Sequence, residues 1–169
     1  SSSLASNSIF RIRGIEIPFS GWVDLWQRFA SDCRNDHNQA PICSAVKRGK
    51  MKTLVCGGRN YNDREFLAFF LGSLLFPAPT LIISGAGPGA DQLALAWAAS
   101  RDIMFIGVPA QWTKYDNSAG PIRNALMVDP EHMGQFLPER VVAFPGGPGT
   151  ANMCKLAHYA GIPVIYARP

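Results

Sequence analysis

The chain has 169 residues, of which 47% are hydrophobic and 17% are charged, and its formal net charge is +4. This composition excludes a disordered chain, and no apolar run reaches the roughly 18 to 20 residues of a membrane-spanning helix. We therefore expect one main domain and no membrane contact. The mild positive charge is scattered, so it suits an anionic ligand without requiring nucleic acid.

Residues 1–50 lack the repeating strand and helix pattern that begins at Met51. They are therefore predicted to form an N-terminal extension, with a boundary near Lys50. Ser1–Ser8 is serine-rich and is interpreted as a tag or tail. The residues before Glu16 include arginines and no acidic residue, a composition that also occurs in organelle transit peptides. From Trp22 to Phe29, apolar side chains recur at positions i, i+3, i+4 and i+7, which predicts an amphipathic helix with an aromatic face. That face is expected either to cover the domain or to join two subunits.

From Met51 onward, apolar runs that read as strands alternate with helical patterns. The predicted strands are Thr53–Cys56, Thr80–Ser84, Ile103–Val108, Arg140–Phe144 and Pro163–Tyr166, and the predicted helices are 63–76, 90–100, 121–127 and 150–159. This alternation predicts an α/β fold over residues 51–169. The expected form is a Rossmann-like, doubly wound parallel sheet of about five strands with helices on both faces.

Three glycine-rich turns follow predicted strands, at 56–59, 84–91 and 145–150. Turns that follow parallel strands lie together at the carboxyl edge of the sheet, where open α/β folds bind ligands. A helix that begins at such a turn directs free N–H groups and the positive end of its dipole at an anion, and Thr150 can cap that helix or bond the anion. A single turn of this kind can be purely structural, but three together predict a shared phosphate site.

The turn at 120–124 carries Arg123, whose guanidinium group can make a bidentate hydrogen bond to a phosphate, and Asn124, which can hydrogen-bond a hydroxyl or an amide. The loop before it holds Trp112, an aromatic group on which a base can stack, or a packing residue. The predicted ligand-binding residues are Gly57, Gly58, Arg59, Ser84, Gly85, Ala86, Gly87, Gly89, Ala90, Asp91, Arg123, Asn124, Pro145, Gly146, Gly147, Gly149 and Thr150. There is no strict GxGxxG and no GxxxxGK[ST], so ordinary NAD binding and Walker-type ATP hydrolysis are not indicated.

The four cysteines have no CxxC spacing, and Cys56 and Cys154 are interpreted as inert packing in a strand and a helix. A reducing cytoplasm fits this usage best. The three histidines are dispersed, so we expect no metal and no cofactor. No serine, histidine and acid arrangement indicates covalent catalysis.

The motifs PGGPGT at 145–150, SGAGPGAD at 84–91 and GPIRN at 120–124 together resemble those of the SLOG superfamily, over 51–169. These are Rossmann-like domains that include the LOG-type phosphoribohydrolases (once called lysine decarboxylases), the DNA-processing protein DprA and sensors of nucleotide-derived signals. The resemblance is nearest to the YspA/YpsA-related branch of small bacterial and phage proteins. LOG-type enzymes have a glutamate three residues after the threonine of PGGxGT, where this chain has Met153.

The resemblance implies a nucleotide or another phosphorylated ribose derivative as ligand, held by the glycine turns with Arg123 and Arg59. It also implies a signal sensor as one form that this function can take. The alternative is a nucleoside 5′-monophosphate phosphoribohydrolase in which Asp91 replaces the missing glutamate and acts with Arg123; Asp63 is a second carboxylate near these turns. Binding of single-stranded DNA in the manner of DprA is the third hypothesis. We also expect a homodimer or a larger homo-oligomer.

Overall fold

The computed structural model describes residues 9–12, 15–18 and 51–169, and the chain divides into two units, Ser1–Lys47 and Arg48–Pro169. In the first unit, β1 (Ile9–Ile12) and β2 (Ile15–Pro18) form an antiparallel pair. The sequence predicts no strand in this region. The predicted helix at 22–29 lies outside the described residues.

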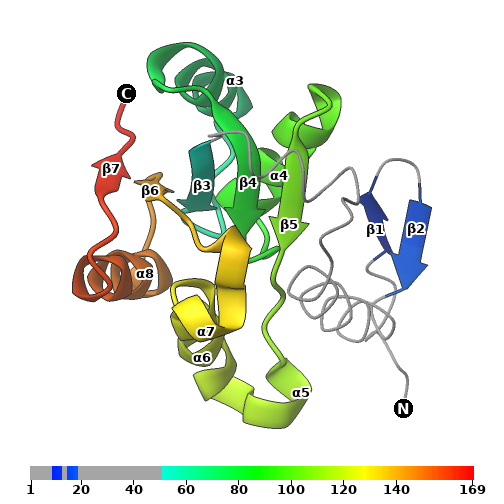
Figure 1. The fold of residues 1–169 in the computed structure, drawn as a ribbon, viewed down its shortest axis with the longest axis vertical. Coiled ribbons are helices and arrows are strands. Elements are labelled where there is room, and N and C mark those ends of the chain that lie inside the picture. The colour runs from blue at the N-terminus through cyan, green and yellow to red at the C-terminus, as the bar shows by residue number, and fades with distance from the viewer. Residues whose placement is uncertain (1–8, 13–14, 19–50) are drawn as a thin grey trace. The chain divides into compact units, whose positions relative to one another are not determined.

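The second unit is built on a five-stranded parallel sheet with the strand order β5-β4-β3-β6-β7 (Figure 1). The strands are β3 (Met51–Cys56), β4 (Pro79–Ser84), β5 (Met104–Gly107), β6 (Arg140–Ala143) and β7 (Val164–Tyr166). The chain runs outward from β3 to β5 and then returns to β6 on the other side of β3. This reversal places the topological switch point at the carboxyl ends of β3 and β6, the position at which doubly wound folds bind ligands.

Helices cover both faces of this sheet, as the sequence predicts. On one face α3 (Arg64–Phe69) packs beside α4 (Ala90–Ser100), and on the other α6 (Ala119–Met127) packs beside α8 (Pro148–Tyr159). Between residues 51 and 169 the structure also has α5 (Trp112–Tyr115) and α7 (Pro130–Met133), two single-turn helices that the sequence does not predict. None of the helices in the described parts of the chain is long and apolar enough to cross a membrane.

Burial along the strands explains why both faces need a helical layer. In β3 the successive residues Leu54 and Val55 are both fully buried, although their side chains point to opposite faces. Val55 packs in a core cluster with side chains of α3 and α4, including Leu67, Ala94 and Trp97. The continuous apolar runs in the sequence thus correspond to strands that are covered on both sides.

The first predicted helix, 63–76, is divided in the structure. Asp63 caps α3 by accepting a hydrogen bond from the N–H of Phe66 at 2.9 Å, and the helix continues as a π-helical segment, η1 (Phe70–Leu74). Pro77 lacks an N–H donor and restricts the conformation of the residue before it, so the helix ends before this proline. The carboxylate of Asp63 is therefore occupied as a helix cap.

Candidate functional site

The three glycine-rich turns meet at the carboxyl edge of the sheet. The turn after β3 lies between the other two: the N–H of Gly58 donates to the carbonyl oxygen of Pro145 at 2.9 Å, and the carbonyl oxygen of Gly58 accepts from the N–H of Ala90 at 3.2 Å. Backbone hydrogen bonds therefore fix the turns after β4 and β6 relative to each other through the turn after β3.

Several glycines in these turns are required by the protein's own packing. Gly89 has a φ of +81°, and a Cβ at this position would overlap the carbonyl oxygen of Gly58. A Cβ at Gly146 would overlap the backbone N of Gly58 and the hydroxyl oxygen of Thr150, and one at Gly85 would overlap the guanidinium group of Arg123. These glycines allow chain segments to approach each other closely, whether or not a ligand is bound.

Two other glycines face open space. A Cβ at Gly147 or Gly149 would meet no protein atom within 4 Å. Gly147 is the N-cap of α8 and Pro148 is its first residue, so the helix begins earlier than the sequence predicts. Thr150 lies inside the first turn and is not the cap. The first-turn N–H groups of α8 have no carbonyl partner within the helix, and this end of α8 is open to an approaching anion.

Side chains of the GPIRN segment on α6 make hydrogen bonds to the backbone of these turns. The Nη1 of Arg123 donates to the carbonyl oxygens of Gly85 and Val108, which follow β4 and β5. Asn124 is buried, and its Nδ2 donates to the carbonyl oxygen of Gly149 at 3.3 Å and to Oδ1 of Asn152 at 3.0 Å. α6 therefore links the turn after β4 to the beginning of α8. Among the described residues, the Nη2 of Arg123 has no hydrogen-bond partner.

Ser84, Ala86 and Ala90, three predicted ligand-binding residues, shape the turn after β4. Ser84 is fully buried, and its hydroxyl donates to the carbonyl oxygen of Asp91 and accepts from the N–H of Ala86, each at 3.2 Å. Ala86 adopts a positive φ of 55°, and Ala90 is fully buried in the core. The side chains of Ser84 and Ala90 therefore serve the turn and the core.

The site combines one buried carboxyl group with two cations. Asp91 is 9% exposed, and burial raises its pKa to about 6, although Arg123, the N–H of Gly87 and Arg59 act in the opposite direction. The Oδ2 of Asp91 accepts a hydrogen bond from the N–H of Gly87 at 3.3 Å. The pKa of Arg123 is lowered by burial, with Asp91 opposing this effect and the nearby positive charge of Arg59 adding to it. Two guanidinium groups from different elements thus lie close enough to repel each other.

Arg59 also connects this site to an aromatic side chain. Its guanidinium carbon lies 5.2 Å from the ring centroid of Trp112 on α5, a cation–π distance, and the Trp112 side chain is 47% exposed. An exposed indole beside a pair of guanidinium groups is an arrangement on which a heterocyclic base can stack. The loop that carries Trp112 therefore contributes to the same edge of the sheet.

The position that holds glutamate in LOG-type enzymes is apolar and inaccessible here. Met153 is 1% exposed and lies on the buried side of α8. In the described part of the chain, no group of three or more histidine, cysteine or acidic side chains is arranged to hold a metal ion.

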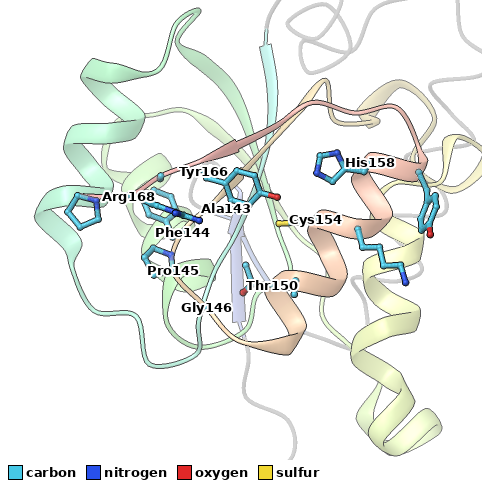
Figure 2. Close-up of a pocket in the computed structure, with 14 residues that line it drawn as sticks. Ala143, Phe144, Pro145, Gly146, Thr150, Cys154, His158, Tyr166 and Arg168 are labelled. Carbon is cyan, nitrogen blue, oxygen red and sulfur yellow. The ribbon is translucent and has the colours of Figure 1, made fainter.

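A groove of about 930 Å³ lies beside the turn after β6, between α8 and the residues at the end of the chain (Figure 2). It is lined by Ala143, Phe144, Pro145, Gly146, Thr150, Ala151, Cys154, Lys155, His158, Tyr159, Tyr166, Ala167, Arg168 and Pro169. The sequence predicts the glycine turn but not the groove, because no motif marks residues 154–169. The lining contains lysine, histidine and arginine and no acidic residue.

The fold and the arrangement of the turns define a Rossmann-like α/β domain with a candidate anion site at the carboxyl edge of its sheet. Residues 51–115 match the model of the YspA, cpYpsA-related SLOG family (YAcAr), and this match supports membership of the SLOG superfamily. Membership supports binding of a nucleotide-related ligand in general. The match covers the turns after β3 and β4, whereas Arg123 and the turn after β6 follow it in the chain. No curated protein matches the chain.

Proposed function

We propose that this domain binds a nucleotide or a nucleotide-derived ligand with a phosphorylated ribose. The observation that carries the proposal is the proximity of Arg59 and Arg123, whose like charges repel each other, with a single buried carboxyl group, Asp91, beside them. A bound phosphate would relieve this repulsion by pairing with both guanidinium groups.

In this proposal the phosphate lies against the turns at 85–89 and 146–150. Gly147 and Gly149 let it approach the backbone, and the first-turn N–H groups of α8 donate to its oxygens. Arg59 supplies an exposed positive charge, and the Nη2 of Arg123 supplies donors that no described residue uses. The base stacks on Trp112, whose ring Arg59 covers in this structure.

The first experiment is a thermal-shift screen of the protein against nucleotides, ribose phosphates, ADP-ribose and its cyclic forms. A ligand present at about 100 times its Kd stabilises a fold by roughly 2.7 kcal/mol. Arg59→Ala is the most informative variant, because Arg59 is exposed and no described residue depends on it for a hydrogen bond. The ligand-induced shift should fall strongly in Arg59→Ala and persist in the control Arg64→Ala, an exposed arginine on α3.

A shift that survives in Arg59→Ala would contradict the proposed anion site. If no small molecule shifts the melting temperature, the proposal in this form fails, and single-stranded DNA becomes the next ligand to examine. Binding to DNA would be recognised by an affinity that falls steeply as the salt concentration rises.

A second candidate function is hydrolysis of the N-glycosidic bond of a nucleoside 5′-monophosphate. It is favoured by Asp91, because a carboxyl group with a pKa near 6 is poised to accept a proton close to neutral pH. Water would attack the anomeric carbon and Asp91 would take the proton of that water. The glycosidic bond would break, and the base would leave with its electron pair and take up a proton from solvent. Chromatography for free base tests this, and Asp91→Asn should abolish product while ligand binding remains.

We also propose that the chain forms a homodimer or a larger homo-oligomer and acts in the cytoplasm. Light scattering of the full chain measures the mass directly. If the mass is that of a dimer, removal of residues 1–50 tests whether the predicted aromatic helix joins the subunits, because an unchanged mass would assign the interface to residues 51–169.

A further inference from the structure

A row of three side chains crosses the sheet beside the groove. Cys56 at the end of β3 pairs in register with Ala143 on β6, and Ala143 pairs with Tyr166 on β7. The preceding residues, Val55 and Val142, pack in the core cluster with α3 and α4. Because side chains alternate along a strand, Cys56, Ala143 and Tyr166 point to the opposite face, which α8 covers.

Cys154 on α8 lines the same groove as Ala143 and Tyr166. Ala143, the central member of the row, has a small side chain. Cys154 makes side-chain hydrogen bonds with Cys56 on one side and Tyr166 on the other. In Figure 2 the Tyr166 hydroxyl points toward the sulfur of Cys154 across the groove. Three elements that are distant in sequence thus converge on one sulfur.

The hydrogen bonds distinguish the two thiols. The pKa of Cys154 is lowered to about 7, because the Cys56 thiol and the Tyr166 hydroxyl donate to its sulfur. The pKa of Cys56 is raised well above its ordinary value by the neighbouring Cys154 and by burial. Near pH 7 a substantial fraction of Cys154 is therefore thiolate, whereas Cys56 keeps its proton. The thiolate is the nucleophilic form of cysteine.

Of the two cysteines, only Cys154 can be reached from the groove. Cys154 lines the groove, whereas Cys56 does not. Both side chains are largely buried, with exposed fractions of 6% for Cys154 and 8% for Cys56, so a bulky reagent is excluded. A small hydroperoxide that enters the groove therefore meets Cys154, whereas Cys56 contacts Cys154 from outside the groove lining.

We propose that Cys154 is a peroxide-reactive thiol and that Cys56 is its resolving partner. The Cys154 thiolate attacks one peroxide oxygen, the O–O bond breaks, and the leaving oxygen takes a proton to give water or an alcohol. Cys154 is then a sulfenic acid. The sulfur of Cys56, after losing its proton, attacks the sulfenic sulfur, the S–O bond breaks and water leaves. The two cysteines together lose two electrons to the peroxide and form a disulfide.

The test uses the full-length chain with Cys33→Ser and Cys43→Ser, so that only this pair can react. Hydrogen peroxide added to the reduced protein should produce a mass lower by two hydrogen atoms and a cross-linked peptide joining Cys56 to Cys154. In Cys56→Ser, peroxide should add one oxygen atom to Cys154, the trapped sulfenic acid, which peptide mass spectrometry localises without a bulky reagent. In Cys154→Ser, Cys56 should stay unmodified at the same peroxide dose.

The rate at neutral pH provides a second measurement. Cys154 should react roughly tenfold faster than free cysteine at pH 7, because a larger fraction is thiolate. Tyr166→Phe removes one donor, so the midpoint of the pH–rate profile should rise. Lys155→Met is the matched control, because it removes a neighbouring charge on α8 without removing a donor to Cys154, and it should leave the midpoint unchanged. The titratable and charged groups around the pair are Tyr166 and Arg168 near β7, Lys155 and His158 on α8, Arg123 on α6, and Asp91 on α4.

Three results would each overturn the proposal. They are failure to form the disulfide, oxidation of Cys56 before Cys154, and a pH–rate midpoint in Tyr166→Phe that equals that of the wild type. Melting temperatures of the reduced variants separate these outcomes from misfolding. Arg59→Ala should leave peroxide reactivity intact, so the test stands apart from the proposed ligand site.

Discussion

The candidate site has a closed side and an open side, both built from glycine-rich turns. On the closed side, Gly85 and Gly89 lie where a Cβ would overlap the Arg123 guanidinium or the backbone of Gly58. On the open side, Gly147 and Gly149 have no protein atom within 4 Å of a Cβ position. The same residue type therefore does two different things in one site. Closed glycines bring chain segments together, whereas open glycines leave a surface free.

The largest expected effect is that of Gly89→Ala on the closed side. Alanine would have to adopt a φ of +81° and would place its Cβ against the carbonyl oxygen of Gly58. That oxygen cannot easily move, because it accepts from the N–H groups of both Tyr61 and Ala90. We expect a loss of about 4 kcal/mol in the free energy of unfolding, measured by urea denaturation.

Gly134→Ala is the matched control for this prediction. Gly134 also has a positive φ, of 53°, but a Cβ there would meet nothing within 4 Å. It should therefore cost only the conformational strain of a positive φ, about 1 to 3 kcal/mol. Equal losses in the two variants would mean that close packing between the turns does not require glycine at position 89.

The second effect concerns Asp91, which faces the closed side. Its pKa is raised to about 6 mainly by burial, so the folded state binds its proton more tightly than the unfolded chain does. The contribution of Asp91 to stability is fully present below about pH 4 and is lost as the pH rises through about 6. Because one pKa unit corresponds to 1.36 kcal/mol, the wild-type protein should lose up to about 3 kcal/mol across this window.

Asp91→Asn tests this sign, because asparagine does not ionise but can still accept from the N–H of Gly87. Denaturant titrations from pH 4 to pH 8 should show a flatter pH dependence in the variant than in the wild type. Glu65→Gln, an exposed change on α3, should keep the wild-type profile. A variant profile as steep as the wild type would show that ionisation of Asp91 does not govern stability in this range.

Much of the fold can be predicted from the sequence, because buried parallel strands are continuous apolar runs and the longer helices have clear turn signals. The beginning of α8 is predicted two residues late, since Pro148 is read as part of the turn although proline is well suited to the first position of a helix. The helices α5 and α7 are single turns, too short for a periodic pattern.

The site is harder to predict, because its geometry depends on contacts distant in sequence. The arginine of GPIRN is predicted to face an anion, but its Nη1 donates to carbonyl oxygens of Gly85 and Val108. Cys56 and Cys154 are interpreted from the sequence as inert packing, yet strand register and one face of α8 bring them together with Tyr166. No local pattern encodes such a meeting.

The smallest effect on stability is expected for Gly149→Ala on the open side, and it tests the comparison most directly. Gly149 is the second residue of α8, where alanine should stabilise the helix by about 0.5 kcal/mol. Gly120→Ala is its matched control, since Gly120 is the second residue of α6 and a Cβ there makes only an ordinary contact with Trp112. Both variants should melt at or slightly above the wild-type temperature.

Only Gly149→Ala should lose the ligand-induced shift, because its methyl group occupies the surface on which we propose the phosphate lies. If both variants keep that shift, openness at Gly149 does not mark the ligand's approach, and the phosphate must be held on the closed side by Arg59 and Arg123.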